Sequence, residues 1–146
     1  MLHFLENHDE QRIASAYFAG NAEKAKPALA AGALMSPGAY MVYAGQEIGE
    51  AGMDAEGFSG NDGRTTIFDY WNPASLQKLT APAFEKKLTP EEAALYDYYQ
   101  KILTLCNSRK AFAQGGFFDL QYANYGRDYG YNCDRQYSFL RHFGRE

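Results

Sequence analysis

The sequence predicts an α/β fold in which short buried strands alternate with helices. Two short, nearly continuous apolar runs, Leu2 to Leu5 (LHFL) and Ala39 to Ala44 (AYMVYA), are typical of parallel strands buried on both faces. Between them lies an Ala-rich stretch, Ala22 to Met35, that reads as a helix. Each strand is followed by a polar loop, so the order along the chain is a β/α alternation.

The first helical region has clear limits. Pro27 must lie near the first turn of the Ala22 to Met35 helix, or it would kink that helix. Gly38 ends the region before the second strand begins. We also expect a short helical piece over Ala14 to Phe18, directly after the first polar loop.

The second half of the predicted α/β region holds a long loop and a long helix. Gly45 to Leu79 is Gly-rich and polar, and a loop of this length is usually functional or contains small elements of its own. Thr89, Pro90 and Glu92 supply an N-cap, a first-turn proline and a capping-box acid for the helix that follows. Its apolar positions recur at helical spacing: Leu95, Tyr99, Ile102, Leu103 and Cys106. Arg109 and Lys110 suit its C-terminal dipole.

The texture of the chain changes after that helix. Phe117 to Tyr122 and Gln136 to Phe143 read as antiparallel strands with a Gly-, Tyr-, Asn- and Asp-rich connection. We therefore expect a domain boundary near Ala111 to Gly115, which divides the chain into residues 1–112 and 113–146.

Composition narrows the function classes. The 146 residues are 46% hydrophobic and 22% charged, with a net charge of −4, which is typical of a globular domain. No basic stripe and no apolar stretch of membrane-spanning length is present, so we expect neither nucleic acid nor a membrane as partner. Cys106 and Cys133 have no metal or redox spacing, and a disulfide between them stays open, as does the cellular compartment.

The polar residues follow the two strands. Two strands and a few helices cannot close a parallel sheet, because a β/α barrel needs eight strands and about 250 residues. The chain is therefore either a small α+β domain or the end of a barrel. In a barrel, catalytic groups follow the C-terminal ends of strands. Here Asn7, His8, Asp9 and Glu10 follow the first strand, and Gln46, Glu47 and Glu50 follow the second.

These motifs resemble those of the alpha-amylase family, glycoside hydrolase family 13. Phe4 to Asp9 (FLENHD) is similar to the F-x-x-N-H-D signature that follows the seventh barrel strand in that family, and Tyr43 to Glu47 (YAGQE) resembles the run that ends the eighth. The helix from Thr89 resembles the last barrel helix, and the chain from Phe117 resembles the start of the C-terminal all-β domain. The resemblance implies the last two β/α units of a TIM (β/α)8 barrel, followed by part of an antiparallel β domain: the C-terminal fragment of a longer enzyme.

The resemblance also implies roles for single residues. Asp9 matches the catalytic acid that stabilises the transition state, and His8 and Asn7 match substrate-binding positions, with Asn7 also holding the loop. The implied reaction is retaining hydrolysis of α-1,4-glucosidic bonds in starch-like α-glucans. Because the nucleophile Asp and the acid/base Glu follow the fourth and fifth strands in the family, this chain alone is expected to be inactive.

Other readings stay open. His8 and Asp9 also fit a simple loop cap, and the whole chain also fits a non-catalytic carbohydrate-binding or interaction module, or a transglycosylating or debranching relative. Glu47 reads as a structural acid and Arg12 as the partner of a local carboxylate. The stretches Asp54 to Gly57 and Asn61 to Gly63 suggest calcium only weakly, since they lack EF-hand spacing. We therefore assign no cofactor and no metal ligand, and leave calcium to a longer parent enzyme.

The aromatic residues and the strand edges carry the last expectations. Tyr70, Trp71 and the tyrosines from Tyr122 to Tyr137 could stack on sugars, but packing explains them as well. The expected partner is an α-glucan. Open sheet edges pair readily with other chains, so the isolated chain is also expected to self-associate.

Overall fold

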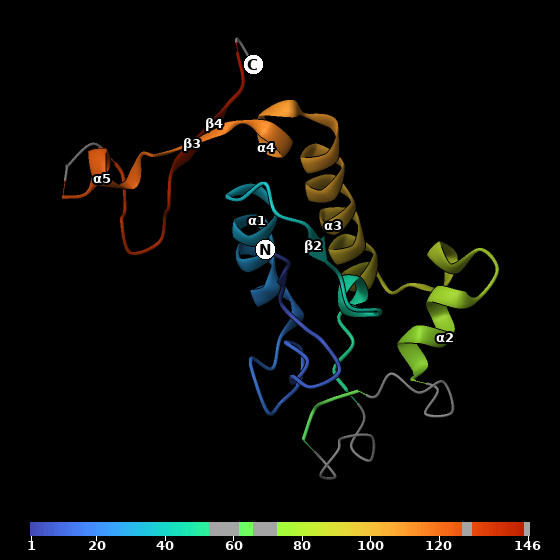
Figure 1. Ribbon diagram of the computed structural model, residues 1–146. Coiled ribbons are helices and arrows are strands. Elements are labelled where there is room, and N and C mark those ends of the chain that lie inside the picture. The colour runs from blue at the N-terminus through green and yellow to red at the C-terminus, as the bar shows by residue number, and fades with distance from the viewer. Residues whose placement is uncertain (53–61, 66–72, 127–129, 145–146) are drawn as a thin grey trace.

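The computed structural model describes residues 1–52, 62–65, 73–126 and 130–144, which form a small mixed α/β structure (Figure 1). In chain order its elements are β1 (His3–Phe4), η1 (Ala22–Lys24), α1 (Ala25–Leu34), β2 (Tyr40–Met41), η2 (Gln46–Ile48), α2 (Ala74–Thr80), η4 (Phe84–Lys87), α3 (Pro90–Ser108), α4 (Lys110–Gln114), β3 (Gly116–Asp119), α5 (Gln121–Asn124) and β4 (Phe139–His142). The η elements are single 3-10 turns. The predicted alternation of strand, helix, strand and helix is confirmed over β1, α1, β2 and α3.

β1 and β2 form a two-stranded parallel sheet. His3 pairs with Tyr40 and Phe4 with Met41, and the His3 N–H donates to the Ala39 carbonyl at 2.8 Å. Parallel pairing is as predicted, but burial on both faces is not: Phe4 is 43% exposed. Among the described residues no third strand flanks this sheet, which explains why both strands are short and half-open.

The core lies between α1 and α3, which run side by side (Figure 1). Its buried members are Leu29, Ala33, Leu34, Leu95 and Tyr99. The predicted capping box at the start of α3 is present: Glu92 N–H donates to Thr89 Oγ1 at 3.2 Å, and Thr89 N–H donates to Glu92 Oε2 at 2.8 Å. Such a cap is worth about 1 kcal/mol, so it fixes where the helix begins.

β3 and β4 form an antiparallel hairpin that projects from the helical body (Figure 1). Arg141 of β4 is buried and attaches the hairpin to that body. Its guanidinium donates to the carbonyls of Leu34 (3.3 Å), Phe112 (3.1 Å) and Gly115 (2.8 Å). Leu34 ends α1, so a cation satisfies a carbonyl that the helix itself leaves unpaired.

Several predicted boundaries are wrong. Ala14 to Phe18 forms consecutive turns rather than a helix, because its amides bond within single turns, such as Phe18 N–H to the Ser15 carbonyl. The strand predicted to reach Tyr122 ends at Asp119, whose Oδ1 accepts from the Gln121 N–H at 2.7 Å and starts a helical turn. The strand predicted from Gln136 begins only at Phe139. α3 ends at Ser108, since Arg109 has an extended backbone and a short separate helix follows.

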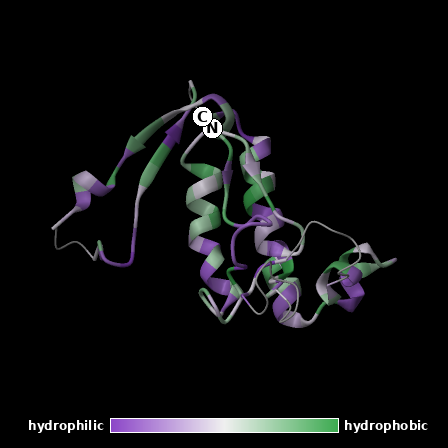
Figure 2. Ribbon diagram, turned by 60° about the horizontal axis from the view of Figure 1, so that its bottom comes forward, coloured by the Kyte–Doolittle hydropathy of each residue, from purple (hydrophilic) through white to green (hydrophobic). Residues whose placement is uncertain are grey.

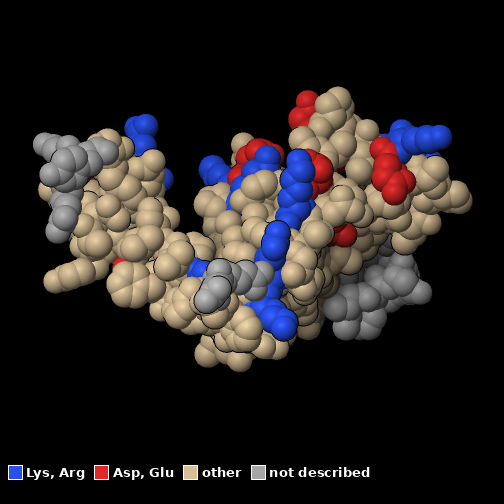
Figure 3. Space-filling view, turned by 90° about the horizontal axis from the view of Figure 1, so that it is seen from above, with Lys and Arg blue, Asp and Glu red and all other residues tan. Residues whose placement is uncertain are grey.

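The surface carries mixed charges over the helical body and few over the hairpin. Figure 3 shows acidic and basic side chains close together in the centre, and mostly neutral side chains on the side that holds β3, β4 and α5. Figure 2 shows that hydrophobic residues continue along the hairpin strands, where Phe117 and Phe118 are 42% and 56% exposed. In the part of the chain that the structure describes, no helix is both long and apolar enough to cross a membrane.

Candidate active site

The polar loop after β1 is organised by the side chain of Asn7. Its Oδ1 accepts from the backbone N–H groups of Asp9 at 2.8 Å and Glu10 at 2.9 Å. An Asn side chain that bonds its own backbone two and three residues ahead forms a tight turn. Asn7 therefore holds the loop, and the carbonyl oxygen of its amide is already engaged.

The turn presents His8 and Asp9 to solvent. Their side chains are 43% and 69% exposed, and His8 Nε2 lies 3.6 Å from Asp9 Oδ2. A neighbouring imidazole and carboxylate that are both accessible can contact the hydroxyls of one small polar ligand. A charged carboxylate accepts hydrogen bonds that are shorter and stronger than those of a neutral group.

Beneath the exposed turn lies a buried ion pair. Arg12 Nη1 donates to Glu6 Oε2 at 2.9 Å, with both side chains almost completely buried, at 1% and 2% exposed. Glu6 Oε1 accepts in addition from the Ile13 N–H at 2.7 Å. Burial raises the pKa of the Glu6 carboxyl, although the hydrogen bonds from Ile13 and Arg12 and the Arg12 charge act in the opposite direction.

Arg12 uses its remaining donors to reach two other segments. Its Nη2 donates to the Ala44 carbonyl just after β2, and its Nε donates to Thr65 Oγ1, both at 2.8 Å. The guanidinium also stacks over the Tyr43 ring, with its carbon 4.2 Å from the ring centroid. The expectation that Arg12 pairs with a local carboxylate is confirmed, and the partner is Glu6.

The residues after β2 face α3 rather than the Asp9 turn. Gln46 is buried and donates through Nε2 to the Tyr99 hydroxyl at 2.8 Å, and burial raises the pKa of that hydroxyl. Gly45 and Gly49, with φ of 90° and 79°, bracket the η2 turn in backbone conformations that favour glycine. The sequence predicted that Gln46 and Glu47 lie beside Asp9 on one rim, the edge formed by the carboxyl ends of β1 and β2. In the structure they face α3 instead.

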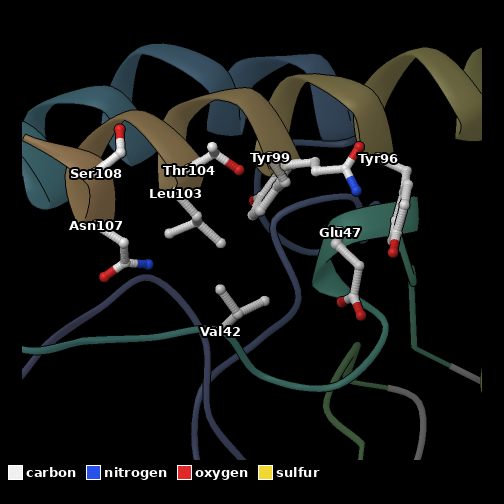
Figure 4. A pocket seen from close by; sticks show the side chains of 9 residues that line it. Val42, Glu47, Tyr96, Tyr99, Leu103, Thr104, Asn107 and Ser108 are labelled. Carbon is white, nitrogen blue, oxygen red and sulfur yellow. The ribbon is translucent and has the colours of Figure 1, made fainter.

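Glu47 lines a groove of about 560 Å³ between α3 and the segment that follows β2, to which Val42 also contributes (Figure 4). Its Oε2 is buried and has no hydrogen-bond partner among the described residues. The expectation that Glu47 is a structural acid stays a prediction. Glu50, the second acid of this segment, is buried, and its Oε1 accepts from the Gly52 N–H at 2.8 Å.

Within the described ranges, no group of three or more His, Cys, Asp or Glu side chains could hold a metal ion. Asp62 Oδ1 instead accepts from the Arg64 N–H at 3.1 Å, which is ordinary turn chemistry. Cys106 and Cys133 are both free thiols, so the disulfide left open by the sequence does not form. Asp54 to Gly57, Asn61, Tyr70 and Trp71 lie outside the described residues.

The comparisons with known proteins define the family. The model of the alpha-amylase family, described as the alpha amylase catalytic domain, matches residues 1–112. The chain therefore belongs to the alpha-amylase family, a family of glycoside hydrolases. Neither the comparison with curated proteins nor that with solved structures gives a match.

The raised pKa of Glu6 gives a testable pH dependence. The folded state holds the carboxyl proton more tightly than the unfolded chain, whose reference pKa is 4.5. The stability that protonated Glu6 contributes is complete below pH 4.5 and is lost as pH rises through the higher folded pKa. We expect Glu6→Gln, which cannot ionise, to remove this loss.

The measurement is urea unfolding of wild type and Glu6→Gln at about pH 4 and about pH 8. The stability of wild type relative to the variant should decrease between these pH values. An increase would show that folding favours the ionised carboxylate, which would contradict a raised pKa of Glu6.

Proposed function

We propose that this chain supplies part of the active-site rim of a retaining glycosidase that cleaves α-1,4-glucosidic bonds in starch-like α-glucans. The observation that carries the proposal is the exposed Asp9 and His8 pair on a turn that directly follows a parallel strand, in a chain of the alpha-amylase family. Catalytic groups of β/α folds occupy this position.

Asp9 would act by binding hydroxyls of the sugar at the cleaved bond. Retaining hydrolysis passes through an oxocarbenium-like transition state, and hydrogen bonds that strengthen there contribute several kcal/mol. A fixed carboxylate also favours the positive charge that develops on the ring. His8 would contact the same sugar, while Asn7 would keep the turn closed through its two backbone bonds.

The nucleophile and the acid/base carboxyl would come from a longer polypeptide. In this proposal residues 1–112 are the last two β/α units of a (β/α)8 barrel, and residues 113–146 begin an antiparallel β domain. The parallel pairing of β1 with β2, the α3 layer and the antiparallel β3–β4 hairpin support that arrangement. The chain on its own would then have no hydrolase activity.

The test of the site is Asp9→Asn in the polypeptide that joins residues 1–146 to the catalytic carboxylates. We expect reducing-end release from starch to fall about 100-fold or more, the scale of losing one group that stabilises charge in a transition state. The matched control is Asp134→Asn, which removes a carboxylate from an exposed position in the C-terminal part and should leave the rate unchanged.

The outcomes of the Asp9→Asn experiment distinguish a catalytic role of Asp9 from the alternative functions. Unchanged hydrolysis in the variant would contradict the role of Asp9 and leave the turn structural. Starch binding without hydrolysis in wild type would favour the non-catalytic binding module, and transfer of glucosyl units to a second glucan would favour a transglycosylating relative.

Self-association of the isolated chain is a second part of this proposal. The β1–β2 sheet is half-open, and Met1 and Leu2 before it are 99% and 52% exposed. Light scattering should show a dimer or larger species at high concentration, and Leu2→Lys should shift it toward the monomer, because a charge at a sheet edge opposes pairing. Leu105→Lys, at a 38% exposed position on α3, is the control. A wild-type monomer at every concentration would contradict the proposal.

A further inference from the structure

The loop that carries Asp9 is closed at its base by one buried contact. Glu6 lies before the exposed turn and Arg12 after it, and the two side chains meet at 2.9 Å. The Ile13 N–H bond to Glu6 closes the same base a second time. These two contacts therefore hold together the two ends of the exposed turn from Asn7 to Glu10, here called the Asp9 turn.

Arg12 also connects the Asp9 turn to the segment after β2 and to the long loop after η2. It donates to Ala44, which follows the neighbouring strand, and to Thr65, which belongs to the long loop after η2. Two further bonds join the same segments: Arg12 N–H donates to the Gly63 carbonyl at 2.8 Å, and the Tyr43 hydroxyl donates to the Thr65 carbonyl at 3.2 Å. One side chain thus links three segments that are remote in sequence.

Arg12 cannot reach a ligand itself. Its side chain is 1% exposed, and its three nitrogens, Nε, Nη1 and Nη2, each donate to a protein acceptor. Any effect on chemistry must therefore pass through the residues that it holds. A planar guanidinium suits this role, since a lysine carries the same charge but cannot reproduce the fixed fork of donors.

We propose that Arg12 is the positioning residue of the site, which holds the Asp9 turn in register with the segment that follows β2. The contacts that carry this proposal are independent of the reaction, whereas the effect on catalysis rests on the proposed function. Glu6 is its anchoring partner. The Arg12 guanidinium keeps the Asp9 turn in a fixed position relative to Ala44, in the segment after β2.

The first experiment follows backbone amide hydrogen exchange in residues 1–146 as wild type, Arg12→Lys and Arg135→Lys. Arg135→Lys is the same substitution at an exposed position. In Arg12→Lys we expect the amides of Asp9 and Glu10, which bond to Asn7, to exchange at least about tenfold faster. Amides of α3 such as Leu95 and Tyr99 should keep their rates, and the control should match wild type throughout.

Two results would overturn the proposal. Unchanged exchange at Asp9 and Glu10 would show that the Asn7 turn holds itself without Arg12. Equally faster exchange in α3 would show that Arg12 contributes general stability rather than local position.

The second experiment measures hydrolysis in the polypeptide that joins residues 1–146 to the catalytic carboxylates. We expect Arg12→Lys to lower kcat about 10- to 100-fold, with KM changed less than about threefold, because a displaced catalytic group weakens transition-state contacts more than binding. A higher KM with unchanged kcat would contradict this. Absent hydrolysis in wild type would contradict the proposed function alone, since the exchange experiment still decides the positioning role.

Discussion

The buried ion pair between Glu6 and Arg12 is the contact on which the arrangement of the rim depends. It closes the base of the Asp9 turn and, through the remaining donors of Arg12, reaches the end of β2 and the long loop beyond it. The His8 and Asp9 side chains above it are 43% and 69% exposed. Their position is therefore determined by Glu6 and Arg12, which are buried beneath the turn where a ligand cannot reach them.

Such a pair is a poor source of stability. Taking two charges out of water costs several kcal/mol per ion, and replacing a buried pair by apolar residues is often neutral or stabilising. The raised pKa of Glu6 points the same way, because it means that desolvation outweighs the hydrogen bonds and the Arg12 charge. Stability comes instead from the packing of α1 against α3 around Leu29, Leu95 and Tyr99. The ion pair positions the Asp9 turn, and the packing of α1 against α3 stabilises the fold that holds this position.

The sequence predicted the elements whose signals are local. The capping box at Thr89 and the apolar spacing along α3 depend on residues a few positions apart, and both are confirmed. Parallel strands followed from two apolar runs separated by a helix. The turns over Ala14 to Phe18 were missed because a short Ala- and aromatic-containing stretch resembles a helix until its amides find other acceptors.

The sequence predicted one buried contact that is local in the chain, the pairing of Arg12 with a nearby carboxylate, while the roles of Asn7, His8 and Asp9 stay predictions. Asn7, His8 and Asp9 stand in a recognisable motif, whereas the joint contact of Arg12 with Ala44 and Thr65 spans 32 and 53 positions in sequence. The direction of Gln46 and Glu47 was equally hidden. A residue after a strand can face the rim or the neighbouring helix, and here the Tyr99 hydroxyl decides for the helix.

A double-mutant cycle on Glu6 and Arg12, measured by urea unfolding at about pH 8, tests this account most directly. Arg12→Met should destabilise the chain, because it leaves Glu6 buried without its counter-charge, and adding Glu6→Gln should recover part of that loss. We predict a coupling energy of about 1–3 kcal/mol between the two positions. Additive losses would contradict the account, since they would mean that Arg12 acts through Ala44 and Thr65 alone and that the ion pair does not organise the rim.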